Sequence, residues 1–243
     1  MASLQEDLAR RARELGANYF GVADLQPARE SVEAQGGQFL AKYPRAVSVG
    51  IRIPEGIVDQ LPNRQNPMVA HTYDYTIYTT VNQSLDRIGL AVSGLLQEAG
   101  HAALAVPASQ TPDRSRLVGL FSHKLAAHLA GLGWIGKSCL LITPDHGPRV
   151  RWVTILTDAP LDAGTPMNQR CRQCKLCVAE CPPQAFTGRS FHADEPREAR
   201  FNPQVCEAYR QEQAKIIGVR ICGMCVYVCP YGRKKRRTPR AVG

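Results

Sequence analysis

The 243-residue sequence contains no apolar run long enough to cross a membrane. Its first residues, MASLQEDLARRARELG, have the pattern of a polar amphipathic helix and lack the apolar segment of a secretory signal. These absences predict a cytoplasmic protein without membrane association. Cysteine is also scarce over most of the chain, because eight of the nine lie between Cys171 and Cys229 and only Cys139 precedes them. Without a secretory signal, this concentration favours a thiolate metal or cluster site over disulfides.

Acidic residues are absent from the last segment, 233–243, which holds six of the positive charges: Arg233, Lys234, Lys235, Arg236, Arg237 and Arg240. The formal net charge is +9, so the rest of the chain carries 9 − 6 = +3. Such a tail can bind a phosphate backbone by releasing counterions, or it can be a solvated end. It has no interleaved aromatic residues that would stack on bases.

Apolar periodicity predicts the elements of the longer, cysteine-poor part. Helical spacing predicts helices, and strict alternation, as in AVSVGIRI, predicts strands. Residues 54–70 are rich in Pro, Asn and Gln and are predicted to form a loop. The predicted helices cover 3–16, 81–99 and 120–130, and the predicted strands cover 19–25, 46–53, 101–109, 139–144 and 150–158.

This alternation of helices and strands predicts an α/β (α+β) domain with a mixed sheet over residues 1–165. Beyond about 160–170, cysteine and proline replace the periodicity. We therefore expect a second, small domain over residues 166–232, followed by the basic tail 233–243.

The eight clustered cysteines form two related motifs. Cys171, Cys174, Cys177 and Cys181, followed by Pro182, match the bacterial ferredoxin spacing C-x2-C-x2-C-x3-C-P. In that arrangement, the first three thiolates hold one [4Fe–4S] cluster and the fourth ligates the other cluster. The second motif, Cys222-x2-Cys225-x3-Cys229-Pro230, lacks its first member, which Cys206 can supply. The expected ligands are Cys171, Cys174, Cys177 and Cys229 for cluster 1, and Cys181, Cys206, Cys222 and Cys225 for cluster 2.

Zinc is the alternative, because it also binds four thiolates with C-x2-C spacing. A C-x2-C-x2-C triplet followed by C-P is not a usual zinc spacing, so two [4Fe–4S] clusters and electron transfer are the favoured interpretation.

The segment HLAGLGWIGKSCLLITPDHGPRVRWVTILTDAPL (128–161), followed by both Cys-Pro motifs, resembles the epoxyqueuosine reductase family. It resembles the corrinoid-dependent reductive dehalogenases more weakly. The resemblance implies a nitroreductase-like α/β domain that holds cobalamin against a ferredoxin-like double-cluster domain. It further implies that the clusters pass electrons to cobalt. The sequence has no Asp-x-His-x-x-Gly signature, so we expect binding without a histidine ligand from the protein.

The resemblance places a cofactor-binding function on the GLGWIGKS segment. Its glycines allow close approach of a ligand to the backbone and offer N–H groups to amide or phosphate oxygens. The alternative is that the glycines serve only a tight turn and close packing, with the tryptophan in the core. The residues concerned are Gly131, Gly133, Trp134, Gly136, Lys137 and Ser138.

The catalytic acid of the family is not found at its expected place. The position of the family's Asp falls at Leu117. Substitute proton donors are Asp113, the nearest carboxylate, and His123, Lys124 and Tyr75. Cys139 is expected to be an ordinary buried residue, and a thiol with a redox role or facing cobalt is the alternative.

These residues leave two main functions open. The first is a corrinoid and double-cluster reductase that acts on epoxyqueuosine in tRNA or on a small organic substrate, with a flavodoxin or ferredoxin as electron donor. The second is an electron-transfer protein that reduces a partner, such as another corrinoid protein. A third hypothesis is a nucleic-acid-binding module that depends on the basic tail.

Overall fold

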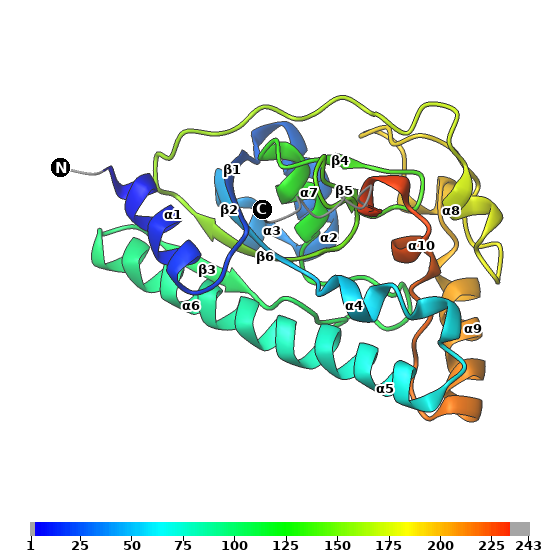
Figure 1. Cartoon of the computed structure of the whole chain (residues 1–243). Helices are drawn as coiled ribbons and strands as arrows, with labels where there is room; N and C mark the ends of the chain where they lie inside the picture. The colour runs from blue at the N-terminus through cyan, green and yellow to red at the C-terminus, as the bar shows by residue number, and fades with distance from the viewer. Residues whose placement is uncertain (1–2, 234–243) are drawn as a thin grey trace, which may run out of the picture.

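The computed structural model describes residues 3–233, and its main feature is a four-stranded sheet with the order β1-β2-β6-β3 (Figure 1). The strands are β1 (Tyr19–Asp24), β2 (Arg45–Arg52), β3 (Ala103–Val106) and β6 (Val150–Thr157). All three ladders are antiparallel. The predicted mixed sheet is therefore wrong. The chain between β2 and β3 is mostly helical, and the two strands run in the same direction. They are not paired with each other, because β6 lies between them and pairs antiparallel with both.

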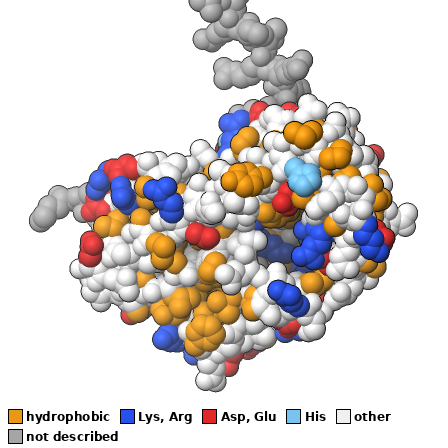
Figure 2. All heavy atoms as spheres, turned by 90° about the horizontal axis from the view of Figure 1, so that it is seen from below, with side chains coloured by type: hydrophobic (Ala, Val, Ile, Leu, Met, Phe, Trp, Pro, Cys, Tyr) orange, Lys and Arg blue, Asp and Glu red, His pale blue; other side chains and the backbone are white. Residues whose placement is uncertain are grey.

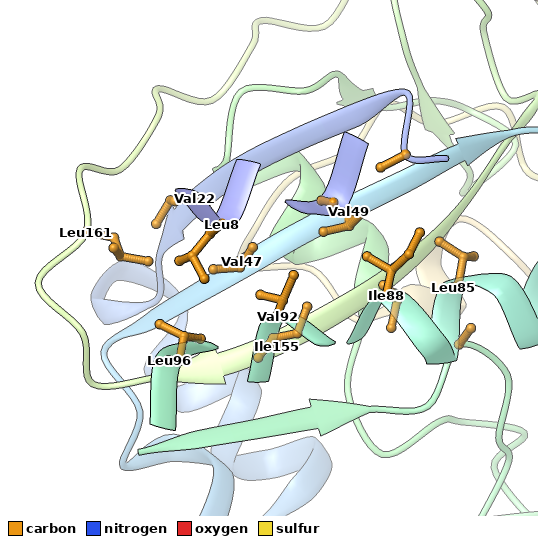
Figure 3. Close-up of a cluster of buried hydrophobic side chains, with 14 of the residues drawn as sticks. Leu8, Val22, Val47, Val49, Leu85, Ile88, Val92, Leu96, Ile155 and Leu161 are labelled. Carbon is orange, nitrogen blue, oxygen red and sulfur yellow. The ribbon is translucent and has the colours of Figure 1, made fainter. Parts of the chain in front are cut away.

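Helices cover both faces of the sheet, because each strand alternates its apolar side chains between two cores. Val47, Val49 and Ile155 face α1 (Leu4–Glu14) and α6 (Asn82–Glu98), as Figure 3 shows. Ala46 and Leu156 face the other core, which contains α2 (Arg29–Gly36), α3 (Gln38–Ala41) and α7 (His123–Leu129). The start of α1 is stabilised by a capping box between Ser3 and Glu6.

The predicted loop 54–70 is wrong, because most of it is helical. It contains α4 (Glu55–Val58), a 3-10 turn and the start of α5 (Pro67–Asp74), and a π-helical segment, Tyr75–Val81, continues α5 into α6. Asn66 caps α5 by accepting a hydrogen bond from the backbone N–H of Met68, and Pro67 takes the first helical position. These are helix-start signals, which the Pro and Asn content concealed.

The other predicted elements are found with shorter bounds. Residues 120–130 become α7, 101–109 become β3, and 139–144 become β5 (Leu141–Ile142). The last of these does not join the main sheet but pairs with β4 (Trp134–Ile135) in a separate hairpin. Within residues 3–233, no helix is long and apolar enough to span a membrane.

The cysteine-rich part contains short helices and one long one. These are α8 (Leu176–Ala179), α9 (Pro203–Ile217) and α10 (Met224–Tyr227), which lie together at one end of the molecule (Figure 1). Ile217 and Ile221 pack with Tyr73 and Leu61 in a shared core, so this part is attached to the rest through the α5 region. The nitroreductase-like and ferredoxin-like descriptions and the boundary at 165/166 stay predictions. Apart from Arg233, the basic tail lies outside the described residues.

Candidate cluster and cofactor site

All nine cysteines are free thiols, and the eight of the two motifs fall into two groups by their electrostatic influence on one another. Burial raises the pKa of Cys177 to about 12, and Cys171, Cys229 and Cys174 add to the shift. Burial raises the pKa of Cys229 to about 11. Hydrogen bonds from the backbone N–H groups of Tyr231 and Gly232 oppose this shift, and Cys171 and Cys174 add to it. These four form the first group.

The second group is centred on Cys225. Burial raises its pKa strongly, and Cys222, Cys206 and Cys181 follow as the next causes, ahead of Cys177 of the first group. Burial likewise raises the pKa of Cys206 to about 11, with Arg210 opposing the shift and Cys222 and Cys181 adding to it. Within residues 3–233 no three such side chains converge closely enough to hold one metal ion, so the grouping rests on mutual influence and not on ligand distances.

Cysteine sulfur atoms in both groups accept hydrogen bonds. The backbone N–H of Ala185 donates to Cys181 Sγ at 3.3 Å, and the indole Nε1–H of Trp134 donates to Cys171 Sγ at 3.5 Å. Such donors stabilise the thiolate, whereas burial favours the protonated thiol. A bound iron–sulfur cluster replaces the thiol protons and fits both features, because it lets buried sulfur stay deprotonated.

Trp134 is a positioning residue in this account. Its side chain is 1% exposed and lies edge-on to Tyr231, with ring centroids 4.8 Å apart. Trp134→Phe keeps the ring packing and removes the N–H···S hydrogen bond. Hydrogen bonds to cluster sulfur raise the reduction potential, so we expect the potential of one cluster to become more negative by tens of millivolts. For a one-electron couple, about 59 mV corresponds to a tenfold change in the equilibrium constant.

An anaerobic redox titration followed by electron paramagnetic resonance measures this shift. The matched control is Trp152→Phe, because Trp152 lies on β6 and its ring packs against that of Tyr19, with centroids 5.5 Å apart. A potential that is the same in Trp134→Phe and in the unaltered protein would contradict the assigned role of the indole.

The six residues predicted to bind a cofactor lie close to neighbouring protein atoms. A Cβ on Gly133 would lie 2.3 Å from the carbonyl oxygen of Ile142, and one on Gly131 would lie 2.6 Å from that of Thr165. Lys137 and Ser138 are buried, and Lys137 Nζ donates to the carbonyl oxygen of Arg172 at 2.6 Å. These contacts favour close packing, the alternative left open by the sequence. Trp134 contacts Cys171, and a Cβ on Gly136 would lie 3.4 Å from Cys171 Sγ, so the segment supports the first cysteine loop.

A cavity of about 710 Å³ lies beside this segment, between the α/β part and the residues that precede Cys206. Its walls come from α2, the loops 106–110 and 116–122, α7, the β4–β5 hairpin, the start of β6, and residues 191–200, and the glycine segment contributes Ile135. None of the six predicted cofactor residues lines it. Figure 2 shows a hollow in the surface seen from below, with Lys and Arg side chains inside it and at its edge. The basic residues of the cavity wall are Arg116, Lys124, Arg151, Arg197 and Arg200 together with two histidines, His123 and His128.

The structure brings only some of the predicted proton donors to this cavity. Leu117, at the position of the family's Asp, lines the cavity, and so do His123 and Lys124. The backbone of Leu117 has a φ of 52°. Asp113 and Tyr75 do not line the cavity. The pKa of Asp113 is lowered, mainly by a hydrogen bond from Ser115 Oγ at 2.6 Å, so this carboxylate is a poor proton donor.

His123 is held by two hydrogen bonds, which fix its tautomer. Nε2–H donates to the carbonyl oxygen of Pro107 at 3.0 Å, so Nδ1 accepts from Thr154 Oγ1 at 2.8 Å. Burial lowers the pKa of His123 to about 4, and Arg151 adds to the shift. The ring is therefore neutral at pH 7.

This shift predicts a pH dependence of folding. Between pH 6.5 and 4 the unfolded state binds the proton and the folded state does not, so the free energy of unfolding falls as the pH falls through this window. The loss is about 2 kcal/mol, after reduction for solvent that reaches the partly buried ring. His123→Gln should flatten this part of an anaerobic pH series of urea titrations, and the exposed His192→Gln should not. Equal slopes in all three proteins would disprove the neutral, buried His123.

Cys139 lies beside the cavity wall with 3% exposure and a φ of 54°. Burial raises the pKa of its thiol, and Lys124 and Arg200 oppose the shift. Lys124 Nζ donates to the carbonyl oxygen of Cys139 at 2.8 Å, and Arg200 Nη1 lies 4.0 Å from its Sγ. A structural role is sufficient to explain these contacts.

Arg151 and Arg200 are among the cavity residues that were not predicted from the sequence. Arg151 carried a signal, since it is a charged residue within an apolar strand run. Arg200 had none, because it lies in the non-periodic stretch before Cys206 and reaches the cavity only through tertiary contacts with Phe191 and Cys139.

The two thiol groups are typical of one class of domain, the double-cluster iron–sulfur domains. Residues 170–232 match the family model of the 4Fe-4S double cluster binding domain. This match supports two [4Fe–4S] clusters.

More particularly, the chain is similar to epoxyqueuosine reductases. It is 32% identical over 125 residues to the epoxyqueuosine reductase of Listeria monocytogenes, covering 47% of this chain and 31% of that protein. It is 24% identical over 261 residues to the enzyme of Aliivibrio fischeri, covering 95% of this chain and 67% of that protein. The resemblance inferred from the motifs is confirmed. The matched part of the chain thus spans less than a third of the Listeria relative.

Solved structures share the fold. An epoxyqueuosine reductase from Bacillus subtilis matches with a TM-score of 0.62 and 18% identity over 96% of this chain and 66% of that chain. The catabolic reductive dehalogenase NpRdhA matches with a TM-score of 0.69 and 20% identity over 94% of this chain and 32% of that chain.

Proposed function

We propose that this chain is an iron–sulfur oxidoreductase similar to epoxyqueuosine reductase, with two [4Fe–4S] clusters and a corrinoid. Cys171, Cys174, Cys177 and Cys229 would hold cluster 1, and Cys181, Cys206, Cys222 and Cys225 would hold cluster 2. One observation carries the proposal: eight buried or half-buried thiols fall into two groups of four in a segment that also forms one wall of a large cavity.

The cavity offers wall chemistry that suits a cofactor of the proposed kind, and its volume of about 710 Å³ would enclose part of such a molecule. Trp152 and Phe191 provide apolar wall, and Arg200 offers a buried Nε–H without a partner among residues 3–233, which suits the amide and phosphate oxygens of a corrinoid. When bound, the corrinoid supplies a strongly reducing cobalt centre, and the clusters supply one-electron transfer.

Lys124 is the proton donor that we retain. It lines the cavity, and burial lowers its pKa, with Arg200 and Arg197 adding to the effect. A lysine with a lowered pKa can give up a proton nearer to neutral pH than an exposed one. His123 is neutral and held by two hydrogen bonds, and Asp113 and Tyr75 are not in the wall.

The test is a turnover assay on the complete protein. Protein that is anaerobically reconstituted with iron, sulfide and cobalamin is mixed with tRNA containing epoxyqueuosine and a flavodoxin, a ferredoxin or a chemical reductant. We expect queuosine to form, as measured by mass spectrometry of the nucleosides, and Lys124→Met to lower the rate by about 10²-fold or more. The same rate in Lys124→Met would remove this residue from the mechanism.

The second candidate is an electron-transfer protein, which the leucine at the family's acid position favours. In that case, the reconstituted protein would reduce a separate corrinoid protein and would not convert epoxyqueuosine. Both candidates require the same two clusters.

A further inference from the structure

Arg200 carries a buried charge without an acidic partner. Its side chain is 5% exposed, and its Nε–H has no hydrogen-bond acceptor within residues 3–233. The contacts that it does make are with Cys139 Sγ at 4.0 Å and with the ring of Phe191, 4.7 Å from the guanidinium carbon. Neither neutralises the charge. A buried charge is costly unless an opposite charge or strong hydrogen bonds compensate it.

Two further cations of the same cavity wall lack a carboxylate among the described residues. Lys124 Nζ donates one hydrogen bond, to the carbonyl oxygen of Cys139 at 2.8 Å. Arg151 donates from Nε and Nη2 to the neutral amide oxygen of Asn82, at 3.1 and 3.0 Å. A ligand that enters the cavity therefore meets positive charge with free donors.

The acidic residues of the wall do not cancel this excess. Glu198 forms an ion pair with Arg197 at 2.7 Å, and Glu195 forms one with Arg189, although Glu195 Oε2 is buried without a hydrogen-bond partner among the described residues. Both carboxylates are thus matched by arginines of their own segment.

We propose that the cavity binds a small, largely apolar molecule through one oxyanion, a carboxylate or a phosphate, which Arg200 and Lys124 hold. Phe191 and Trp152 in the wall suit the apolar part of such a molecule. An arginine fork and an ammonium group are the usual partners of these anions, and their charge-assisted hydrogen bonds are stronger in a site of low dielectric. The inference rests on the proposed function in that it names the ligand class of the same cavity.

Isothermal titration of the protein with both clusters loaded tests this. The probes are phenylacetate and phenyl phosphate, and phenylacetamide is the neutral match of the first. We expect the anions to bind at least about tenfold more tightly than the amide. Arg200→Gln should remove about tenfold or more of the affinity for the anions and leave that for the amide unchanged. Arg13→Gln, an equal charge change at an exposed site on α1, should alter neither.

Repeating the titration with cobalamin bound separates the two occupants of the cavity. If the anions bind with and without cobalamin, the small ligand has its own site and the proposal is supported. If cobalamin abolishes their binding, the corrinoid takes the site of the anions and the proposed small ligand is overturned. Equal affinity for phenylacetate and phenylacetamide, or unchanged anion affinity in Arg200→Gln, overturns the proposal. Iron content and cobalamin uptake are measured on the same samples, so this failure is distinct from a failure of the proposed function. Lys124→Met repeats the comparison if Arg200→Gln does not fold.

Discussion

Replacing Cys171 and Cys229 together by serine should remove one cluster and leave the other, so that iron falls from about eight to about four per chain. The reason is the crossed ligand set, in which the first cysteine of one motif and the last of the other belong to the same cluster. The influence of Cys171 on the pKa of the Cys229 thiol supports this pairing. By contrast, replacing Cys171 and Cys181 together should disrupt both clusters and leave little iron.

These two double variants separate crossed from sequential ligation. In a sequential arrangement, Cys171 and Cys181 would serve the same cluster, so the outcomes of the two variants would be exchanged. Cys139→Ser is the matched control, because this buried thiol belongs to neither group, and it should keep about eight irons. Iron and sulfide analysis of anaerobically purified proteins gives the answer, and exchanged outcomes would refute the crossed assignment.

Gly133→Ala should destabilise the fold by about 1–3 kcal/mol. The added Cβ would lie 2.3 Å from the carbonyl oxygen of Ile142, so the β4–β5 hairpin must open. Gly94→Ala is the control: it lies in α6, where a Cβ meets nothing within 4 Å, and alanine there should stabilise by up to about 1 kcal/mol.

Anaerobic urea titrations followed by circular dichroism measure both changes, and cobalamin uptake is measured beside them. The packing account of the GLGWIGK segment expects lost stability in Gly133→Ala with or without cobalamin. Unchanged stability together with lost cobalamin uptake would favour the cofactor role implied by the family resemblance.

How far the sequence predicts this protein depends on how local each signal is. The strand at 46–53 and the cysteine motifs were predictable, because alternation and ligand spacing are local properties. The antiparallel order was not, because it depends on β6 inserting between β2 and β3. The helix Pro67–Asp74 was concealed by its Pro- and Asn-rich start. It packs on Ile217, far along the chain, and no local pattern reveals that contact.

The same distinction holds for the candidate site. His123 and Lys124 were named because they stand near the family's acid position, and both reach the cavity. The six residues of the glycine segment were named for a cofactor, yet their neighbours are backbone carbonyls and the Cys171 loop, which no local pattern reveals.

Metal analysis of the anaerobically purified protein tests the central claim most directly. The account predicts about eight irons and about eight sulfides per chain, with the absorption spectrum of [4Fe–4S] clusters that bleaches on reduction. About two zinc ions per chain, with neither iron nor sulfide after reconstitution, would contradict it, since the eight thiols would then form two structural zinc sites.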